Sequence, residues 1–187
     1  MKRLVLAALL ATAAATSLAL PAAAEINILA GDDLLKHVTD GNLNGARASI
    51  MKGSSPNMAD KGGKTLLIVA INSGRFDMVK LLLDQGANPN NADRVGNTPL
   101  IWAAESGQID SIDALIKRGA RLDQENRQGL TPLMVAARAG RADSVERLLK
   151  AGARVDIADY TGRTALGWAR EGRNARVTTL IQNAGGR

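Results

Sequence analysis

A spacing of 33 residues recurs along this chain, and it restricts the fold more than any other feature of the sequence. Two glycine columns and single columns of threonine, leucine and alanine all follow it. Their members are Gly63, Gly96, Gly129 and Gly162; Gly53, Gly86, Gly119, Gly152 and Gly185; Thr65, Thr98, Thr131 and Thr164; Leu67, Leu100, Leu133 and Leu166; and Ala70, Ala103, Ala136 and Ala169. A unit of this length cannot bury its own apolar face, so neighbouring units are expected to stack into a solenoid.

Within each unit the residues predict a tight turn followed by two short helices. An Asp or Asn three residues before the periodic glycine is typical of a type I turn. These residues are Asp60, Asp93, Asn126 and Asp159. Threonine can then cap the first helix, and a glycine can end it in a left-handed conformation. The helix-ending glycines are Gly74, Gly107 and Gly140. The second helix carries an apolar stripe, of which Val145, Leu148 and Leu149 are one example.

The segments GNTPLIWAAESG at 96–107 and GLTPLMVAARAG at 129–140 resemble the ankyrin repeat, whose pattern contains Thr-Pro-Leu-His and a following Ala-Ala and Gly. The resemblance implies an all-α ankyrin-repeat solenoid with hairpin-like turns and about five repeats, including caps. The expected domain spans 25–187. It divides into an N-terminal cap repeat at 31–60, full repeats at 61–93, 94–126 and 127–159, and a C-terminal cap repeat at 160–187.

Two departures from the family pattern lead to further expectations. The family's histidine after Thr-Pro-Leu is absent, and its positions hold Ile68, Ile101, Met134 and Gly167. Hydrogen bonds that this histidine makes between repeats are therefore expected to be missing, so that stability depends more on apolar packing. In the last repeat the helix-ending glycine is expected one position early, at Gly172.

The first 24 residues have the features of a secretory signal peptide. Lys2 and Arg3 precede an apolar stretch, Pro21 ends it, and three alanines precede the expected cut between Ala24 and Glu25. The apolar stretch is shorter than the roughly 20 residues that a membrane span prefers. The mature chain is therefore expected in the periplasm or outside the cell, with no stable membrane anchor.

Charge and residue usage narrow the choice of partner. Removing Lys2 and Arg3 lowers the formal net charge from +6 to +4. Residues 120–187 carry 12 basic and 7 acidic side chains, so the excess lies in the C-terminal part. For an exported protein this skew favours an acidic protein surface over nucleic acid, with anionic lipid or polysaccharide as an alternative.

Catalytic and cofactor-binding patterns are weak. The chain has no Cys and one His, His37, which removes thiol nucleophiles and any site with two imidazoles. Gly62-Gly63-Lys64-Thr65 ends like a phosphate-binding loop, but Met58 stands where the motif needs its first glycine. The acidic clusters near Asp60, Asp93 and Asp159 hold too few carboxylates for calcium. We therefore expect a protein that is not an enzyme and has no metal or cofactor.

In ankyrin stacks the turn tips and the inner short helices form a concave binding surface. Here that surface holds both tryptophans, the only tyrosine and several arginines, which are residue types enriched in binding hot spots. The predicted contact residues are Lys61, Lys64, Arg94, Asn97, Trp102, Glu105, Arg127, Gln128, Arg138, Tyr160, Arg163 and Trp168. Two alternatives stay open: the tryptophans fill space between repeats, or the arginines form only a solvated face.

The resemblance implies that the chain works as a monomeric protein-binding module or scaffold, and assistance to an exported enzyme is one role that fits it. An inhibitor or immunity protein that occludes a toxin or hydrolase is an alternative with the same surface. An enzyme whose site the sequence does not reveal, and a binder of anionic lipid or polysaccharide, are alternatives of other classes. The sequence does not name the partner.

Overall fold

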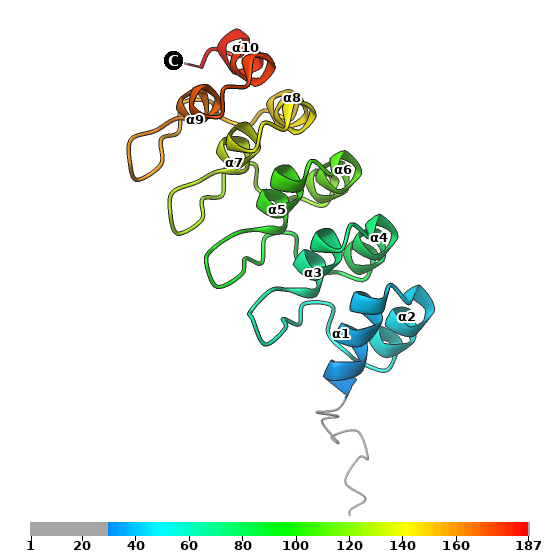
Figure 1. Cartoon of the computed structure of the whole chain (residues 1–187). Coiled ribbons are helices and arrows are strands. Elements are labelled where there is room, and N and C mark those ends of the chain that lie inside the picture. Colours follow the sequence, from blue (N-terminus) through cyan, green and yellow to red (C-terminus); the bar gives the residue numbers. More distant parts are fainter. Residues whose placement is uncertain (1–29, 187) are drawn as a thin grey trace, which may run out of the picture.

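The computed structural model describes residues 30–186, and this part of the chain folds into a single stack of helix pairs (Figure 1). The ten helices are α1 (Ala30–Asp40), α2 (Leu43–Met51), α3 (Leu66–Asn72), α4 (Phe76–Asp84), α5 (Pro99–Ser106), α6 (Ile109–Lys117), α7 (Pro132–Arg138), α8 (Ala142–Lys150), α9 (Ala165–Glu171) and α10 (Ala175–Asn183). Within residues 30–186 there is no strand beyond two isolated β-bridges. The expected all-α ankyrin solenoid is confirmed.

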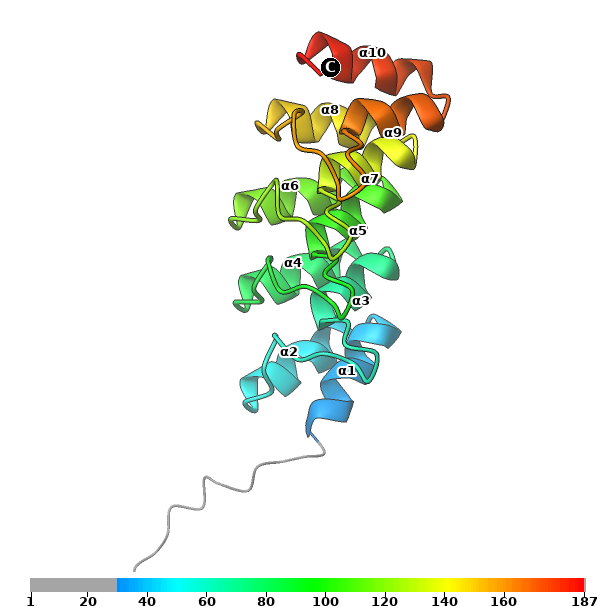
Figure 2. The ribbon, with the colours of Figure 1, turned by 90° about the vertical axis from the view of Figure 1, so that its left-hand side faces the viewer.

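The odd-numbered helices form one column and the even-numbered helices a second one beside it (Figures 1 and 2). We call them the inner and the outer helices. The long turns that precede α3, α5, α7 and α9 all project to the same side, away from the outer helices. Residues at their tips are therefore neighbours across repeats although they are 33 positions apart in sequence.

Local sequence explains where the inner helices begin and end. In each of the last four repeats the periodic threonine is the N-cap, and its hydroxyl oxygen accepts the N–H three residues on. Gly74, Gly107 and Gly140 follow the inner helices with φ of 65°, 77° and 68°, as the sequence predicts. The helices are short because these two signals stand only a few residues apart.

The core is one continuous layer of aliphatic side chains between the two helix columns. Leu67, Leu100, Leu133 and Leu166 are at most 1% exposed, and the alanine column is fully buried. Small alanine side chains on the inner helices let successive repeats approach closely, so α7 packs directly on α5 and α9. The aromatic residues, by contrast, lie at the edges of this layer.

Hydrogen bonds between repeats are present although the family's histidine is absent, so apolar packing is not the only contact that joins them. The residue that precedes each of the outer helices α6, α8 and α10 reaches back to a carbonyl oxygen of the previous repeat. Gln108 donates to Ile71 O at 2.6 Å, Arg141 to Glu105 O at 3.0 Å, and Asn174 to Gly140 O at 3.1 Å. The position before the outer helix therefore supplies hydrogen bonds between repeats in this chain.

The use of different residue types before the outer helices leaves one buried hydroxyl group without a hydrogen-bond partner among the described residues. Ser111 Oγ donates to Gln108 Oε1 at 3.1 Å, which ties the outer helix to the bridging glutamine. Ser144 occupies the same register one repeat later and is fully buried, but its Oγ has no hydrogen-bond partner among the described residues. The reason is that Arg141 replaces the glutamine and has no acceptor to offer.

The end of α9 differs from the sequence-based expectation. Gly172 has φ of −70° and continues the helical conformation. The left-handed position stays in register at Arg173, with φ of 52°, the one non-glycine residue with positive φ in the described part of the chain. A left-handed conformation costs an L-residue roughly 1–2 kcal/mol, so stacking on the previous repeat overrides the local preference here.

The predicted signal peptide and its cut between Ala24 and Glu25 lie outside the described residues. Within residues 30–186, no helix combines the length and the hydropathy that crossing a bilayer requires.

Candidate functional site

The predicted contact residues lie on one face, which we call the finger face: the tips at 61–64, 94–97, 127–130 and 160–163 together with the inner helices α3, α5, α7 and α9 (Figures 1 and 2). The Asp or Asn that stands just before each tip accepts backbone N–H groups of the tip with its side-chain oxygen, and so closes the turn. Asp93 Oδ1 accepts N–H groups of Val95 and Asn97 at 3.0 and 2.9 Å, and Asp159 Oδ1 accepts those of Thr161 and Arg163 at 2.8 and 3.0 Å. The tips are therefore ordered turns rather than loose loops.

Neighbouring tips are joined to one another. The N–H of Arg127 donates to Val95 O at 3.1 Å, and the N–H of Tyr160 donates to Gln128 O at 3.4 Å. This approach needs glycine beneath it, because a Cβ on Gly129 would lie 2.8 Å from Tyr160 Cδ1. At the first junction, the Arg94 guanidinium makes the link instead, donating to Lys61 O at 2.8 Å. The row of tips is thus a connected, preorganised surface.

The two tryptophans have the same structural environment two repeats apart. Trp102 Nε1 donates to Asp93 Oδ2, and Trp168 Nε1 donates to Asp159 Oδ2, each at 3.0 Å. Both indoles are partly buried against the core. Cations cover their faces: Lys64 Nζ lies 4.7 Å from the centre of the Trp102 ring, and the Arg163 guanidinium lies 4.4 Å from the centre of the Trp168 ring. The indoles thus help to hold the tips against the inner helices.

The turn acid beneath Trp168 is held in its ionised form. Burial alone would raise the pKa of Asp159, which is 6% exposed. Hydrogen bonds from Thr161, from the Arg163 backbone and from the Trp168 indole outweigh that effect and keep the pKa below its ordinary value. At Asn126, the equivalent position one repeat earlier, there is no indole, and its Nδ2 donates to Asn97 Oδ1 at 2.8 Å.

Four of the predicted contact residues meet around one cavity of about 330 Å³. It lies between the third and fourth tips, at 127–130 and 160–163, and the inner helices α7 and α9. Tyr160 stands at its edge with 73% of its surface exposed, while Leu130 is only 3% exposed. The lining residues are Gln128, Leu130, Arg138, Asp159, Tyr160, Thr161 and Trp168. We call this cavity the tip pocket.

The cations of the finger face differ in whether an acidic side chain forms an ion pair with them. Arg138 pairs with Glu105 at 3.5 Å, and Arg163 pairs with Glu171. The side chains of Lys61 and Arg127 are exposed and make no ion pair or hydrogen bond among the described residues. An incoming carboxylate would therefore meet Lys61 and Arg127 without displacing another acid.

The remaining predicted residues follow the same face. Lys64, Arg94, Asn97 and Trp102 belong to the second and third repeats, where they build the turns described above. The structure adds Val95, which is 56% exposed at the second tip, and the acids Asp93 and Asp159, which hold the indoles. An Asp nine residues before a Trp was the sequence signal for that pair. Whether these side chains contact a partner stays a prediction.

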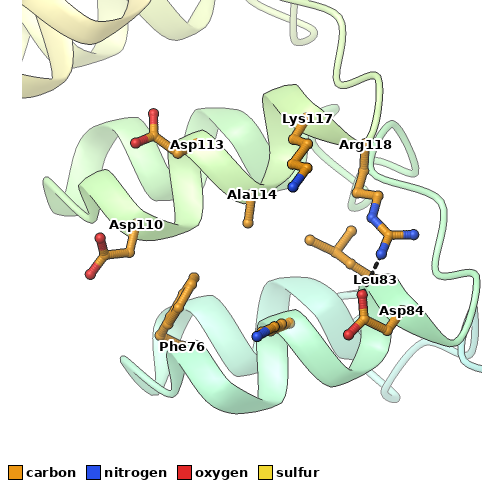
Figure 3. A pocket seen from close by; sticks show the side chains of 9 residues that line it. Phe76, Leu83, Asp84, Asp110, Asp113, Ala114, Lys117 and Arg118 are labelled. Atoms are coloured by element: carbon orange, nitrogen blue, oxygen red, sulfur yellow. Dashed lines mark hydrogen bonds and ion pairs between the residues drawn. The ribbon is translucent and has the colours of Figure 1, made fainter.

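A second cavity of about 320 Å³ lies on the opposite face, between the outer helices α4 and α6 (Figure 3). Phe76, Leu83 and Ala114 give it an apolar floor, and Arg118 pairs with Asp84 at one end. Lys80 and Lys117 line it without an ion pair among residues 30–186. No sequence pattern predicts this cavity, because neighbouring outer helices form it only after stacking.

No described residues form a metal centre: within residues 30–186, no three His, Asp or Glu side chains are grouped closely enough to hold an ion. His37 is partly buried and lies against Gly45, where a Cβ would be 2.5 Å from its Nδ1. The histidine thus packs between α1 and α2 in the first repeat.

Comparison with known families agrees with this architecture. The family model for ankyrin repeats (three copies) matches residues 34–126 and 120–186, which together span nearly all of the described chain. No curated protein matches the sequence. Ankyrin repeats are in general modules for protein–protein interaction. Both the repeat columns and the stacked helix pairs therefore lead to one assignment: this chain belongs to the ankyrin-repeat family.

Proposed function

We propose that this chain is a non-catalytic binding module that acts after export and docks a partner protein on its finger face. The observation that supports this most is that the connected row of tips carries both exposed apolar side chains and unpaired cations. Tyr160 and Val95 are the large apolar residues exposed at tips, and Arg127 stands between them. A preorganised surface loses less conformational entropy when it binds than a flexible one does.

Export is the part of the proposal that depends on residues 1–24. The test is the intact mass of the chain recovered from the exported fraction of an expressing bacterium. We expect a chain that begins at Glu25. A product that retains Lys2 and Arg3 would contradict cleavage and with it the proposed location.

The role of the finger face is tested by reversing its unpaired charges. A partner is first captured by cross-linking the exported chain and is then purified. Lys61→Glu combined with Arg127→Glu should weaken its binding by about tenfold or more, or roughly 1.4 kcal/mol. The association rate should also become less sensitive to salt. Helical content and melting temperature should stay unchanged, because neither side chain has a partner within residues 30–186.

The matched control is Lys80→Glu combined with Lys117→Glu. These lysines are also exposed and unpaired in the described structure, but they lie on the outer helices α4 and α6, on the opposite face. The control should leave binding unchanged. If the outer-face pair is the damaging one, or if neither pair changes binding, then the finger face is not the docking surface.

The uncompensated cations also favour a second candidate, a binder of anionic lipid or polysaccharide. Vesicles that contain an anionic phospholipid, and a sulfated polysaccharide, separate the two functions. Binding to these probes that disappears with added salt, without any discrete protein partner, would favour the second candidate. An inhibitor or immunity role uses the same docking surface and would be recognised from the identity of the captured partner.

A further inference from the structure

The tip pocket combines an apolar interior with a basic surround. Leu130 and the Trp168 indole form its inner walls, and the exposed ring of Tyr160 stands over its edge. With about 330 Å³ it lies at the lower end of ligand-binding pockets, which span about 300–1,000 Å³. That size suits one large side chain better than an extended apolar ligand.

The cations beside this pocket favour carboxylates on a segment that extends beyond it, because the two nearest, Arg138 and Arg163, already pair with Glu105 and Glu171 while Arg127 is unpaired. Arg138 and Arg163 both lie over the Trp168 ring, at 5.4 and 4.4 Å from its centre. Asp159 is the one acid in the lining, and its oxygens already accept hydrogen bonds from Thr161, Arg163 and Trp168. Beyond the pocket the row continues through Arg127 to Arg94, with no acidic residue at either of these tips.

The spacing of the tips defines the form of the partner. Packed helices lie about 8–10 Å apart, and an extended chain advances about 3.3 Å per residue. One repeat therefore corresponds to about three residues of an extended segment. Measured from the tip that carries Tyr160, a segment that follows the row of tips would meet Arg127 after about three positions and Arg94 after about six.

We infer that the partner presents an extended acidic segment with one large apolar residue. This inference rests on the proposed function and specifies its ligand. The apolar side chain enters the tip pocket between Tyr160 and Trp168. Acidic residues about three and six positions away pair with Arg127 and Arg94, whose planar guanidinium groups suit carboxylates. A polysaccharide would leave the apolar pocket unfilled, so the pocket argues for a peptide segment.

The test is selection of random linear peptides displayed on phage against the full exported chain. We expect the selected peptides to share one large apolar residue with acidic residues on one side at intervals of about three. A representative peptide, labelled with a fluorophore, then gives dissociation constants by anisotropy. Tyr160→Ala should weaken its binding by about tenfold. Arg127→Ala should weaken it by about fivefold and reduce the salt dependence.

Phe76→Ala and Lys80→Ala are the matched controls, because they change an exposed aromatic residue and an unpaired cation at the opposite cavity. Both should alter the dissociation constant by less than about twofold. Peptides with no acidic or apolar preference that still need Tyr160 or Arg127 would overturn the inference and leave the proposed function standing. Peptides insensitive to every finger-face variant would overturn both, and so would binding to anionic vesicles or polysaccharide alone.

Discussion

Deleting residues 165–187 is expected to unfold the repeat beside the cut while the earlier repeats stay helical. The deletion removes α9 and α10, which cover α7 and α8. Val135 and Leu148 are now 2% and 0% exposed, and their uncovering costs about 1.5–3 kcal/mol for each side chain. It also removes the bond from Asn174 to Gly140 O and the ion pair between Arg176 and Asp143.

Because each repeat contacts only its neighbours, the damage should decrease with distance from the cut. Circular dichroism should show a loss of helix larger than the deleted residues account for, with a lower melting temperature. Dye binding or aggregation should report the exposed apolar face. Deleting residues 184–187 alone is the control and should have a small effect, since it removes the C-cap of α10 but leaves α9 and α10 in place. Unchanged melting and solubility after the long deletion would mean that the last repeat does not act as a cap.

Replacing Asp93 and Asp159 together by Asn should destabilise the fold by roughly 2–4 kcal/mol, since each change leaves a donor facing a donor. The Oδ1 atom of each acid accepts turn N–H groups, and the Oδ2 atom accepts the indole N–H. An amide has only one acceptor oxygen, so either the turn or the indole loses its partner. Denaturant unfolding followed by circular dichroism measures the effect.

The matched control for this pair is Asp60→Asn. Asp60 closes the same kind of turn, with its Oδ1 accepting the Lys64 N–H at 2.8 Å, but Val69 stands where Trp102 and Trp168 stand in the two tested repeats. The amide oxygen can replace Oδ1 there, and a change within about 0.5 kcal/mol is expected. Equal losses from the control and the test variants would show that the indole bond contributes nothing to stability.

The same variant series has a defined pH dependence at Asp159. Its folded-state pKa lies below the ordinary value, so ionised Asp159 stabilises the fold above about pH 4 and this contribution is lost as the pH falls through the folded-state pKa. The stability difference between the wild type and Asp159→Asn should therefore shrink in acid. A difference that grows as the pH falls would contradict the assignment.

The sequence by itself determined the parts of the fold that local chemistry controls. The threonine column predicts the caps of α3, α5, α7 and α9, and the glycines at 74, 107 and 140 predict the inner-helix ends. These signals act within a few residues, so their periodic recurrence was enough to identify the ankyrin repeat. It also placed Gln128, Arg138, Tyr160 and Trp168 on one face, where the structure groups them around the tip pocket.

Only the tertiary structure decided what depends on the adjacent repeat. Arg173 takes the left-handed position although Gly172 is available one residue earlier, because the register of the stack outweighs a local cost. Gln108, Arg141 and Asn174 donate hydrogen bonds to the previous repeat, and no sequence pattern predicts these bonds. These contacts join residues more than 30 positions apart, and no local pattern encodes them. Their geometry exists only once neighbouring repeats have packed against each other.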